Sequence, residues 1–222
     1  MPDDDTVELT RNLLVGFCRE FIDHPYLCYT EHGLHTRFAS VLYRAISEDQ
    51  RYLTLNGLRI CRVQKEYPTH KDLSKSRRQH WDVSVLKSTV DQQRVPGWYD
   101  HLPLAAVVEF GLNCDLEHLE DDVRRLSHSD SQVGQGFCAH LFRLSDTKSR
   151  PSARDWSTRS RRIHAAEAIR PLLANTGIEV YLGVVDESRS AATGFWRITE
   201  NEVIHFDGGG TQIEAPLIPT TE

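Results

Sequence analysis

Apolar residues recur at helical spacing through the first part of the chain. The spacing predicts an amphipathic helix over residues 7–22, with an apolar stripe made of Val7, Leu9, Leu13, Leu14, Phe17 and Phe21. Pro25 ends this helix, because proline disfavours a helical conformation of the residue before it. A second helix is predicted from an N-cap at Thr30 to about Ser47. Its stripe is made of Leu34, Phe38, Val41, Leu42, Ala45 and Ile46.

Beyond the second helix, the pattern changes to the alternation and short apolar runs that are typical of strands. We predict strands over residues 58–67, 81–86, 104–112, 134–144, 178–185 and 193–199, and helices over residues 115–127 and 156–174. The run at 104–112 is almost entirely apolar, as expected of a central strand that is buried on both faces. Asn56-Gly57 is a turn signal before the first strand.

The order of these elements predicts an α/β fold. Three successive strands favour an antiparallel meander, and the strand–helix–strand unit after it favours a right-handed crossover. A mixed central β-sheet flanked by helices on both faces buries the apolar side of every element. A chain of 222 residues is enough for one sizeable core, so we predict a single domain over residues 1–222.

Composition and cysteine usage indicate a soluble cytoplasmic protein. Hydrophobic residues make up 39% of the chain, and no apolar run approaches the roughly 20 residues that cross a bilayer, so no membrane is expected as a partner. The acidic start of the chain lacks the features of a secretory signal. The five cysteines are scattered and form no Cys-x-x-Cys pair, which favours a reducing compartment over a disulfide framework or a zinc ribbon.

The charge distribution is uneven. The net charge of −6 argues against a general nucleic-acid coat, but basic residues gather in segments 59–94 and 150–170. Such a local basic face could contact phosphates without reading sequence, and the candidate contacts are Lys71, Lys75, Arg77, Arg78, Arg159, Arg161 and Arg162. Solvated charge on exposed faces is the alternative.

Two acids stand where acids are unexpected. Asp82 lies inside a short strand, although aspartate is a poor strand former. Glu109 interrupts the most apolar strand, and an ionised carboxylate there must be paired, metal-bound or protonated. Alternation places Glu109 and Gly111 on one face of that strand. A third acid, Glu31, lies in the first turn of its helix, where the helix dipole already favours negative charge.

The three acids and their order resemble the PD-(D/E)XK nuclease superfamily. The matching segments are Thr30-Glu31-His32-Gly33-Leu34-His35-Thr36-Arg37-Phe38, Arg78-Gln79-His80-Trp81-Asp82-Val83-Ser84-Val85-Leu86 and Ala106-Val107-Val108-Glu109-Phe110-Gly111. The resemblance implies a restriction-endonuclease-like core over about residues 30–145, made of a helix, a three-strand meander, a helix and a strand. An N-terminal helix, a C-terminal elaboration over 146–205 and a tail over 206–222 surround it.

The same resemblance implies a chemistry. Asp82 and Glu109 would bind Mg²⁺ or Mn²⁺ with assistance from Glu31, and the metal would activate a water to hydrolyse DNA. Restriction, repair or defence would suit such a protein, and a homodimer would suit double-strand cutting. The family pattern places a lysine two residues after the second acid, but Gly111 stands there.

Lys65 or Gln64 on the preceding strand could replace the missing lysine. Only one of them can serve, because neighbours on a strand face opposite ways. Two further hypotheses remain open. The protein could be an inactive relative that binds nucleic acid or protein, or it could be a different α/β domain in which Asp82 and Glu109 lie on separate surfaces. His32 and His35 are spaced for a shared metal, but the sequence offers no third ligand at the usual spacing.

Overall fold

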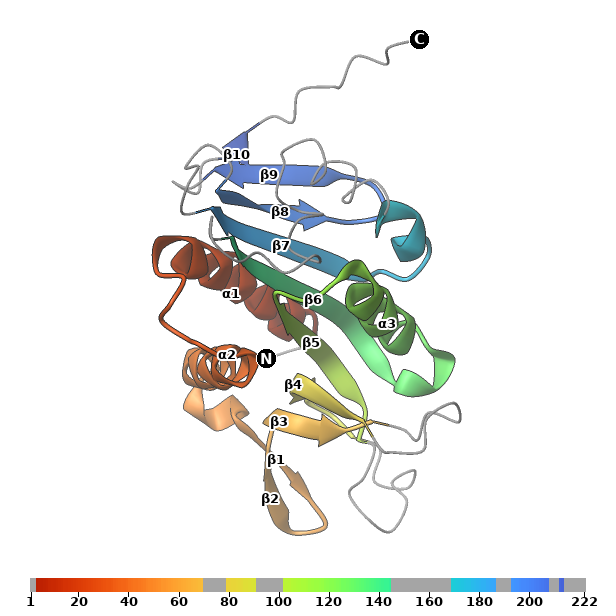
Figure 1. The fold of residues 1–222 in the computed structure, drawn as a ribbon. Helices are drawn as coiled ribbons and strands as arrows, with labels where there is room; N and C mark the ends of the chain where they lie inside the picture. The colour runs from red at the N-terminus through yellow and green to blue at the C-terminus, as the bar shows by residue number, and fades with distance from the viewer. Residues whose placement is uncertain are drawn as a thin grey trace.

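The structure, a computed structural model, describes residues 3–69, 79–90, 102–144, 169–186, 193–207 and 212–213. Within these residues the centre is an eight-stranded sheet in the order β10-β9-β8-β7-β6-β5-β4-β3 (Figure 1). Its strands are β3 (Val63–Pro68), β4 (His80–Leu86), β5 (Leu104–Leu112), β6 (Val133–Leu144), β7 (Glu179–Asp186), β8 (Gly194–Ile198), β9 (Val203–Asp207) and β10 (Gln212–Ile213). Strands β5, β6 and β7 run parallel, whereas the other neighbouring pairs are antiparallel. The predicted mixed central sheet is therefore confirmed.

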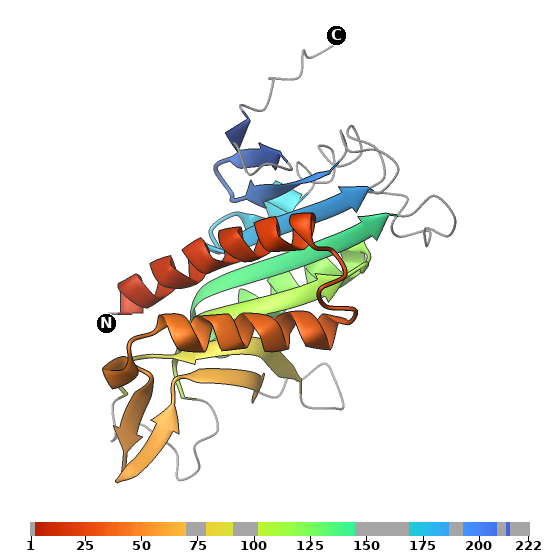
Figure 2. The ribbon, with the colours of Figure 1, turned by 90° about the vertical axis from the view of Figure 1, so that its left-hand side faces the viewer.

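Helices cover both faces of this sheet. Helices α1 (Asp3–Asp23) and α2 (Glu31–Ala45) lie on one face, and α3 (Leu116–Leu126) lies on the other (Figure 2). Each face has its own apolar core, one around Phe17, Phe38 and Phe110, the other around Leu119 and Phe142. Short 3₁₀ turns η1 (Glu48–Gln50), η3 (Ser129–Ser131) and η4 (Arg170–Leu173) link some of the elements.

Helices α1 and α2 follow the predicted ranges closely, but the buried face of α1 is rotated. Thr6 and Thr10 are fully buried in its first half, whereas Leu9 and Leu13 are only partly buried. Thr10 tolerates burial because its hydroxyl donates to the carbonyl of Thr6 at 2.8 Å. In α2, the predicted N-cap is confirmed, since the Thr30 hydroxyl accepts from the backbone N–H of Gly33.

The strand predicted over residues 58–67 is wrong in its continuity, because it is divided at Arg62. Its first half, β2 (Leu58–Cys61), pairs with β1 (Tyr52–Leu55) in a separate hairpin around the Asn56-Gly57 turn. Its second half, β3, belongs to the main sheet. The Arg62 side chain is 2% exposed, and its Nε donates to the carbonyl of Leu86 at 3.0 Å. The backbone of Arg62 is also paired, because its N–H donates to the carbonyl of Arg51 at 2.8 Å and its carbonyl accepts from the N–H of Leu86 at 2.9 Å.

Strand β5 has the predicted bounds, and eight of its nine residues are buried. Val107 packs into the core under α3, while Ala106, Val108 and Phe110 pack under α1 and α2. Alternation therefore places Glu109 and Gly111 on one face, as the sequence predicts, and this face is directed toward α3. Helix α3 follows at once, with Asp115 as its N-cap through a bond from the N–H of His118.

The C-terminal region contains strands that the sequence patterns did not predict. Strands β9 and β10 extend the sheet beyond β8, and β9 continues to Asp207 in the segment interpreted as a tail. Most of the helix predicted over 156–174 lies outside the described residues, and its described end forms η4. Among the helices of the described ranges, none has the length and apolar character needed to span a membrane.

Candidate active site beneath helix α3

The fold brings Asp82 and Glu109 together on the face of the sheet under α3. Val83 pairs with Val108 in the antiparallel ladder of β4 and β5, so the two acids lie on neighbouring strands. Their carboxyl groups are close enough for each to shift the pKa of the other, and Oδ2 of Asp82 accepts from the backbone N–H of Phe110 at 2.8 Å. The hypothesis that these acids occupy separate surfaces is therefore wrong.

The carboxyl group of Glu109 is buried away from solvent. Only 3% of its surface is exposed. Its Oε1 lies 3.1 Å from Nη2 of Arg125, within ion-pair distance, yet no donor makes a hydrogen bond to this oxygen. Burial raises the pKa of Glu109 well above its usual value, the Arg125 charge opposes this rise, and the neighbouring Asp82 and Asp122 add to it. The side chain is therefore a proton or cation acceptor with one oxygen unsatisfied.

Helix α3 and strand β6 supply the rest of the cluster. Asp122 is 2% exposed, and it accepts from Arg125 at 2.6 Å and faces Nε2 of His140 at 3.1 Å. Nε2 of His118 is 3.6 Å from the same oxygen of Asp122. Burial pushes the pKa of Asp122 upward, but the bond and charge of His140, together with Arg125, outweigh burial and hold it below its usual value. We call Asp82, Glu109, Asp122, Arg125 and His140 the α3 cluster.

The α3 cluster has more acids than permanent cations. Its three carboxyl groups face one arginine, so the ionised cluster with a neutral imidazole carries a net charge of −2. An uncompensated charge of this size is costly at buried positions. A proton on Glu109 reduces this charge, and one divalent cation balances it.

Glu31 does not join Asp82 and Glu109. Its carboxylate lies at the end of β5, where it accepts from the N–H of Leu112 at 3.0 Å and from Sγ of Cys114 at 3.6 Å. Among the described residues, two groups of at least three His, Cys, Asp or Glu side chains have ligand atoms within 4.8 Å of one another. They are His118–Asp122–His140 and His32–His35–Glu66. The structure therefore pairs two of the predicted acids and places the third elsewhere.

Lys65 and Gln64 indeed face opposite ways. Lys65 pairs with Val83, which belongs to the core under α1 and α2, and its Nζ lies 2.9 Å from Nε2 of His32 on α2. Gln64 pairs with Ser84 on the α3 side of the sheet, and its amide donates to the carbonyl of Cys61 at 2.6 Å. Gln64 is thus on the face of Asp82, and Lys65 is on the other face.

Steric crowding explains why residue 111 is a glycine. A Cβ at Gly111 would lie 2.6 Å from Cε1 of His140 on the neighbouring strand. Gly111 and His140 are directly paired in the parallel ladder, so the imidazole covers the glycine. The side chain of His140 fills the space that a residue-111 side chain would need, and Asp122 anchors the ring from above.

We expect Gly111→Ala to destabilise the protein by about 1–3 kcal/mol, because the added methyl group must displace the buried ring of His140. Gly16→Ala in α1 is the matched control, since a Cβ there meets no atom within 4 Å, and it should be neutral or stabilise by up to about 1 kcal/mol. Urea unfolding of both variants provides the measurement. Adding His140→Ala should remove most of the penalty at Gly111, and an unchanged penalty would contradict the steric explanation.

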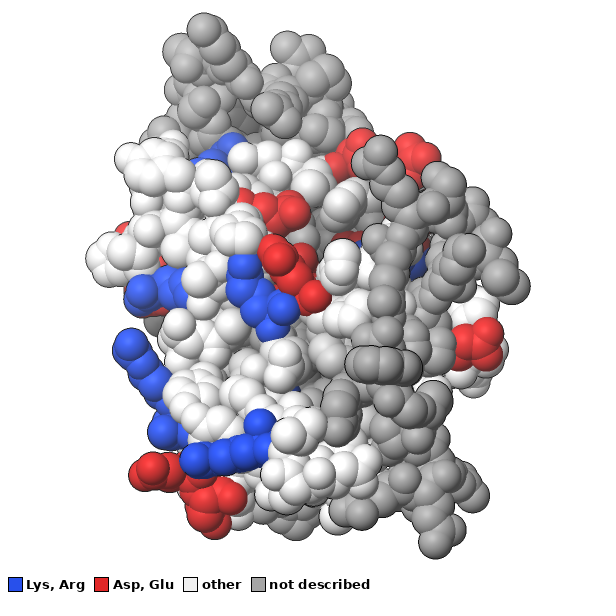
Figure 3. Space-filling model, turned by 90° about the horizontal axis from the view of Figure 1, so that it is seen from below, with Lys and Arg blue, Asp and Glu red and all other residues white. Residues whose placement is uncertain are grey.

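The predicted phosphate contacts Lys71, Lys75, Arg77, Arg78, Arg159, Arg161 and Arg162 all lie outside the described residues. Figure 3 shows the molecule from below, over the end of the sheet that carries β3. Among the described residues on that face, basic and acidic side chains are interspersed, and neither sign forms a broad continuous patch there. The described surface in this view therefore adds no further candidate for a basic face.

A scan against protein-family models and a search of curated proteins both find no match to this chain.

Proposed function

We propose that this protein is a divalent-metal-dependent phosphodiesterase that acts on DNA, with Asp82 and Glu109 as metal ligands. The observation that carries this proposal is the acid excess of the α3 cluster, together with the unsatisfied Oε1 of buried Glu109. A divalent cation balances a net charge of −2. The carboxylate oxygens of both acids are the ligands that Mg²⁺ and Mn²⁺ prefer.

The order of elements supports the same proposal. Helix α2, the meander β3-β4-β5, helix α3 and the parallel strand β6 follow one another as expected of a restriction-endonuclease-like core. The two acids occupy the second and third strands of that meander. This correspondence extends the resemblance of the sequence segments to the arrangement of the chain.

Arg125 fits the role of the missing lysine better than Lys65 or Gln64. It reaches the acid pair from α3, at 3.1 Å from Glu109, whereas Lys65 lies on the opposite face of the sheet with His32. A guanidinium in this place would hold the scissile phosphate and stabilise its developing charge. A bound metal would polarise the phosphodiester and lower the pKa of an attacking water.

Cleavage of supercoiled plasmid by the full chain tests this function. We expect nicking that requires Mg²⁺ or Mn²⁺ and falls by about 100-fold or more in Glu109→Gln, since even partners outside the first coordination sphere are worth 10–100-fold. Glu202→Gln is the control, because it changes an exposed acid beyond β8. The same assay with linear single-stranded and double-stranded DNA extends the range of substrates tested.

A catalytically inactive relative is the second candidate, and the imidazole over Gly111 favours it. Calorimetric titration with Mn²⁺ separates the two. Metal binding that depends on Glu109 without cleavage of any DNA supports a binding module of this fold. The absence of both Glu109-dependent metal binding and cleavage overturns the proposed phosphodiesterase.

A further inference from the structure

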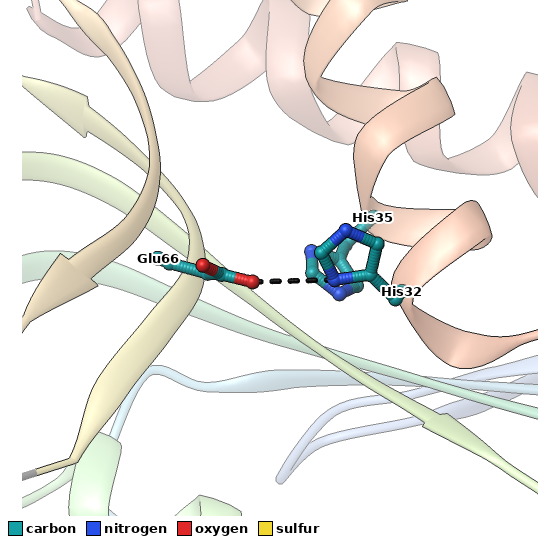
Figure 4. Close-up of side chains that lie close together, drawn as sticks. All are labelled: His32, His35 and Glu66. Atoms are coloured by element: carbon teal, nitrogen blue, oxygen red, sulfur yellow. Dashed lines mark ion pairs between the residues drawn. The ribbon is translucent and has the colours of Figure 1, made fainter.

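The N-terminal turn of α2 and strand β3 bring together three metal-ligating side chains outside the α3 cluster. His32 and His35 lie three residues apart on α2, and their rings meet edge to face with centroids 4.7 Å apart. Glu66 approaches from β3, with Oε1 at 3.2 Å from Nδ1 of His32 (Figure 4). One ligand atom from each residue lies within 4.8 Å of the others. The sequence offered the two histidines but no third ligand.

An irregularity of β3 delivers that third ligand. Lys65 faces α2, so strict alternation would direct Glu66 to the other face. Glu66 instead adopts a φ of +54°, in the left-handed region, and its side chain reaches His32 on the same side as Lys65. Tyr67 then joins the core under α3. The left-handed conformation is unfavourable for a residue with a side chain, and its effect here is to place a carboxylate beside the histidines.

His35 provides an independent indication of a ligand. The residue is 4% exposed, and its Nδ1 has no hydrogen-bond partner in the structure. An unsatisfied buried polar atom is costly, because it has lost its bond to water without gaining another partner. His32 and Glu66, in contrast, have side chains that are 65% and 52% exposed. The cluster thus has a buried anchor and an open, solvent-facing side through which an ion can enter.

A cation already occupies part of this position. The ammonium of Lys65 lies 2.9 Å from Nε2 of His32 and 3.3 Å from Oε1 of Glu66. The lysine side chain therefore stands where a metal ion would bind to the same donors. It is long and partly exposed, so it can swing into solvent when an ion takes its place.

We propose that His32, His35 and Glu66 form a site for a zinc-class divalent transition metal, with Lys65 as the competing cation of the metal-free state. Two imidazoles and one carboxylate are donors that suit Zn²⁺ and its transition-metal relatives, whereas Mg²⁺ prefers oxygen alone. A tetrahedral zinc site places its donors about 3.3–3.5 Å apart. The ligand atoms of His32, His35 and Glu66 lie within 4.8 Å of one another, so they need to approach by roughly an ångström to bind one ion. Three protein ligands leave a fourth coordination position for water or another molecule.

Titration with Co²⁺, a spectroscopic substitute for Zn²⁺, tests this site. All proteins carry His118→Ala, so that the His118–Asp122–His140 group contributes no signal, and the buffer contains excess Mg²⁺, which occupies the proposed Asp82–Glu109 site but prefers oxygen donors to imidazoles. We expect one equivalent of Co²⁺ to give a visible absorption band and Zn²⁺ to remove it by displacement. His32→Ala and Glu66→Gln should each weaken binding by at least about tenfold. Both change exposed side chains, so the fold is expected to persist, and thermal unfolding checks this.

Lys65→Met distinguishes a metal site from a polar cluster. Removing the competing ammonium should tighten Co²⁺ binding by about tenfold, as expected when a like charge beside an ion is deleted. His128→Ala, an exposed histidine after α3, is the matched control and should leave the affinity unchanged. The proposal is overturned if millimolar Co²⁺ gives no band, or if His32→Ala and Glu66→Gln bind as the His118→Ala parent does. An unchanged affinity in Lys65→Met would also overturn the role of Lys65.

Discussion

Arg125→Met is expected to destabilise the protein by about 3–5 kcal/mol at neutral pH, because it removes the cation from a buried group of acids. The guanidinium contacts Glu109 at 3.1 Å and Asp122 at 2.6 Å, and it lies over the ring of Trp81 at 5.3 Å. Methionine keeps the apolar stem that packs under α3 and deletes the charge. Without it, the cluster has three carboxyl groups and no permanent cation.

The pH dependence of this loss has a definite sign. Burial raises the pKa of Asp82 and of Glu109 in the folded protein, and removal of Arg125 raises both further. Acids with raised pKa values cost stability as pH rises from about 4 through the folded pKa. The difference between wild type and Arg125→Met should therefore be largest near neutral pH and shrink on acidification. Urea unfolding at a series of pH values measures it.

Arg124→Met is the matched control for Arg125→Met. Arg124 is the preceding residue of α3, and its side chain is 71% exposed and paired with Asp121 at the surface. Its loss should cost less than about 1 kcal/mol, because exposed ion pairs contribute little. Equal effects of the two substitutions at neutral pH would contradict the charge balance inferred for the α3 cluster.

Glu179→Gln is expected to destabilise the protein by about 3 kcal/mol, the lower end for a buried ion pair that loses one partner. The carboxylate on β7 is 5% exposed, and it accepts from Nε of Arg11 on α1 at 2.7 Å and from Nε of Arg197 on β8 at 2.8 Å. It also accepts from the hydroxyl of Tyr181 at 3.1 Å. Both arginines are about a quarter exposed, which moderates the loss.

The destabilisation caused by Glu179→Gln should disappear at low pH. Burial pushes the pKa of Glu179 up, but the bonds and charges of Arg11 and Arg197 outweigh burial and hold it below its usual value. A lowered carboxyl pKa contributes stability above the unfolded pKa, and this contribution is lost as pH falls through the folded pKa. Thermal unfolding of wild type and Glu179→Gln should therefore converge at low pH.

Glu8→Gln is the matched control for Glu179→Gln, because it removes a different partner of Arg11. Glu8 pairs with the same Arg11, but its side chain is 57% exposed, so its loss should cost less than about 1 kcal/mol. Equal destabilisation by Glu8→Gln and Glu179→Gln would show that burial does not strengthen the ion pairs of Glu179.

Local patterns predicted most of the elements. The apolar run 104–112 coincides with β5, and Thr30 caps α2 as expected of a threonine hydroxyl. Local patterns failed where a distant partner decides the structure. Where the predicted strand is divided, the side chain and the carbonyl of Arg62 are both bonded to the backbone of Leu86, 24 residues away, and strand β9 pairs with the edge that β8 offers.

The candidate site was predictable in part. Asp82 and Glu109 stand out because acids are rare in such strands, and the meander made them neighbours. Asp122, Arg125 and His140 were missed. The two α3 residues look like an ordinary exposed helical pair in the sequence, and only the packing of α3 on β5 and β6 buries them. One sequence feature could have identified His140, because an imidazole is unexpected inside an apolar strand that is buried on both faces.

The sequence by itself determined most of the elements and the mixed sheet, because these follow from periodicity, and it singled out two unexpected acids through the cost of burying charge. Only the tertiary structure decided the partners of those acids. Arg125 reaches Glu109 from the helix above it, and His140 explains Gly111 by filling its space from the neighbouring strand. Glu31 and Lys65 lie elsewhere because the direction of a side chain depends on its packed neighbours, as at the left-handed Glu66.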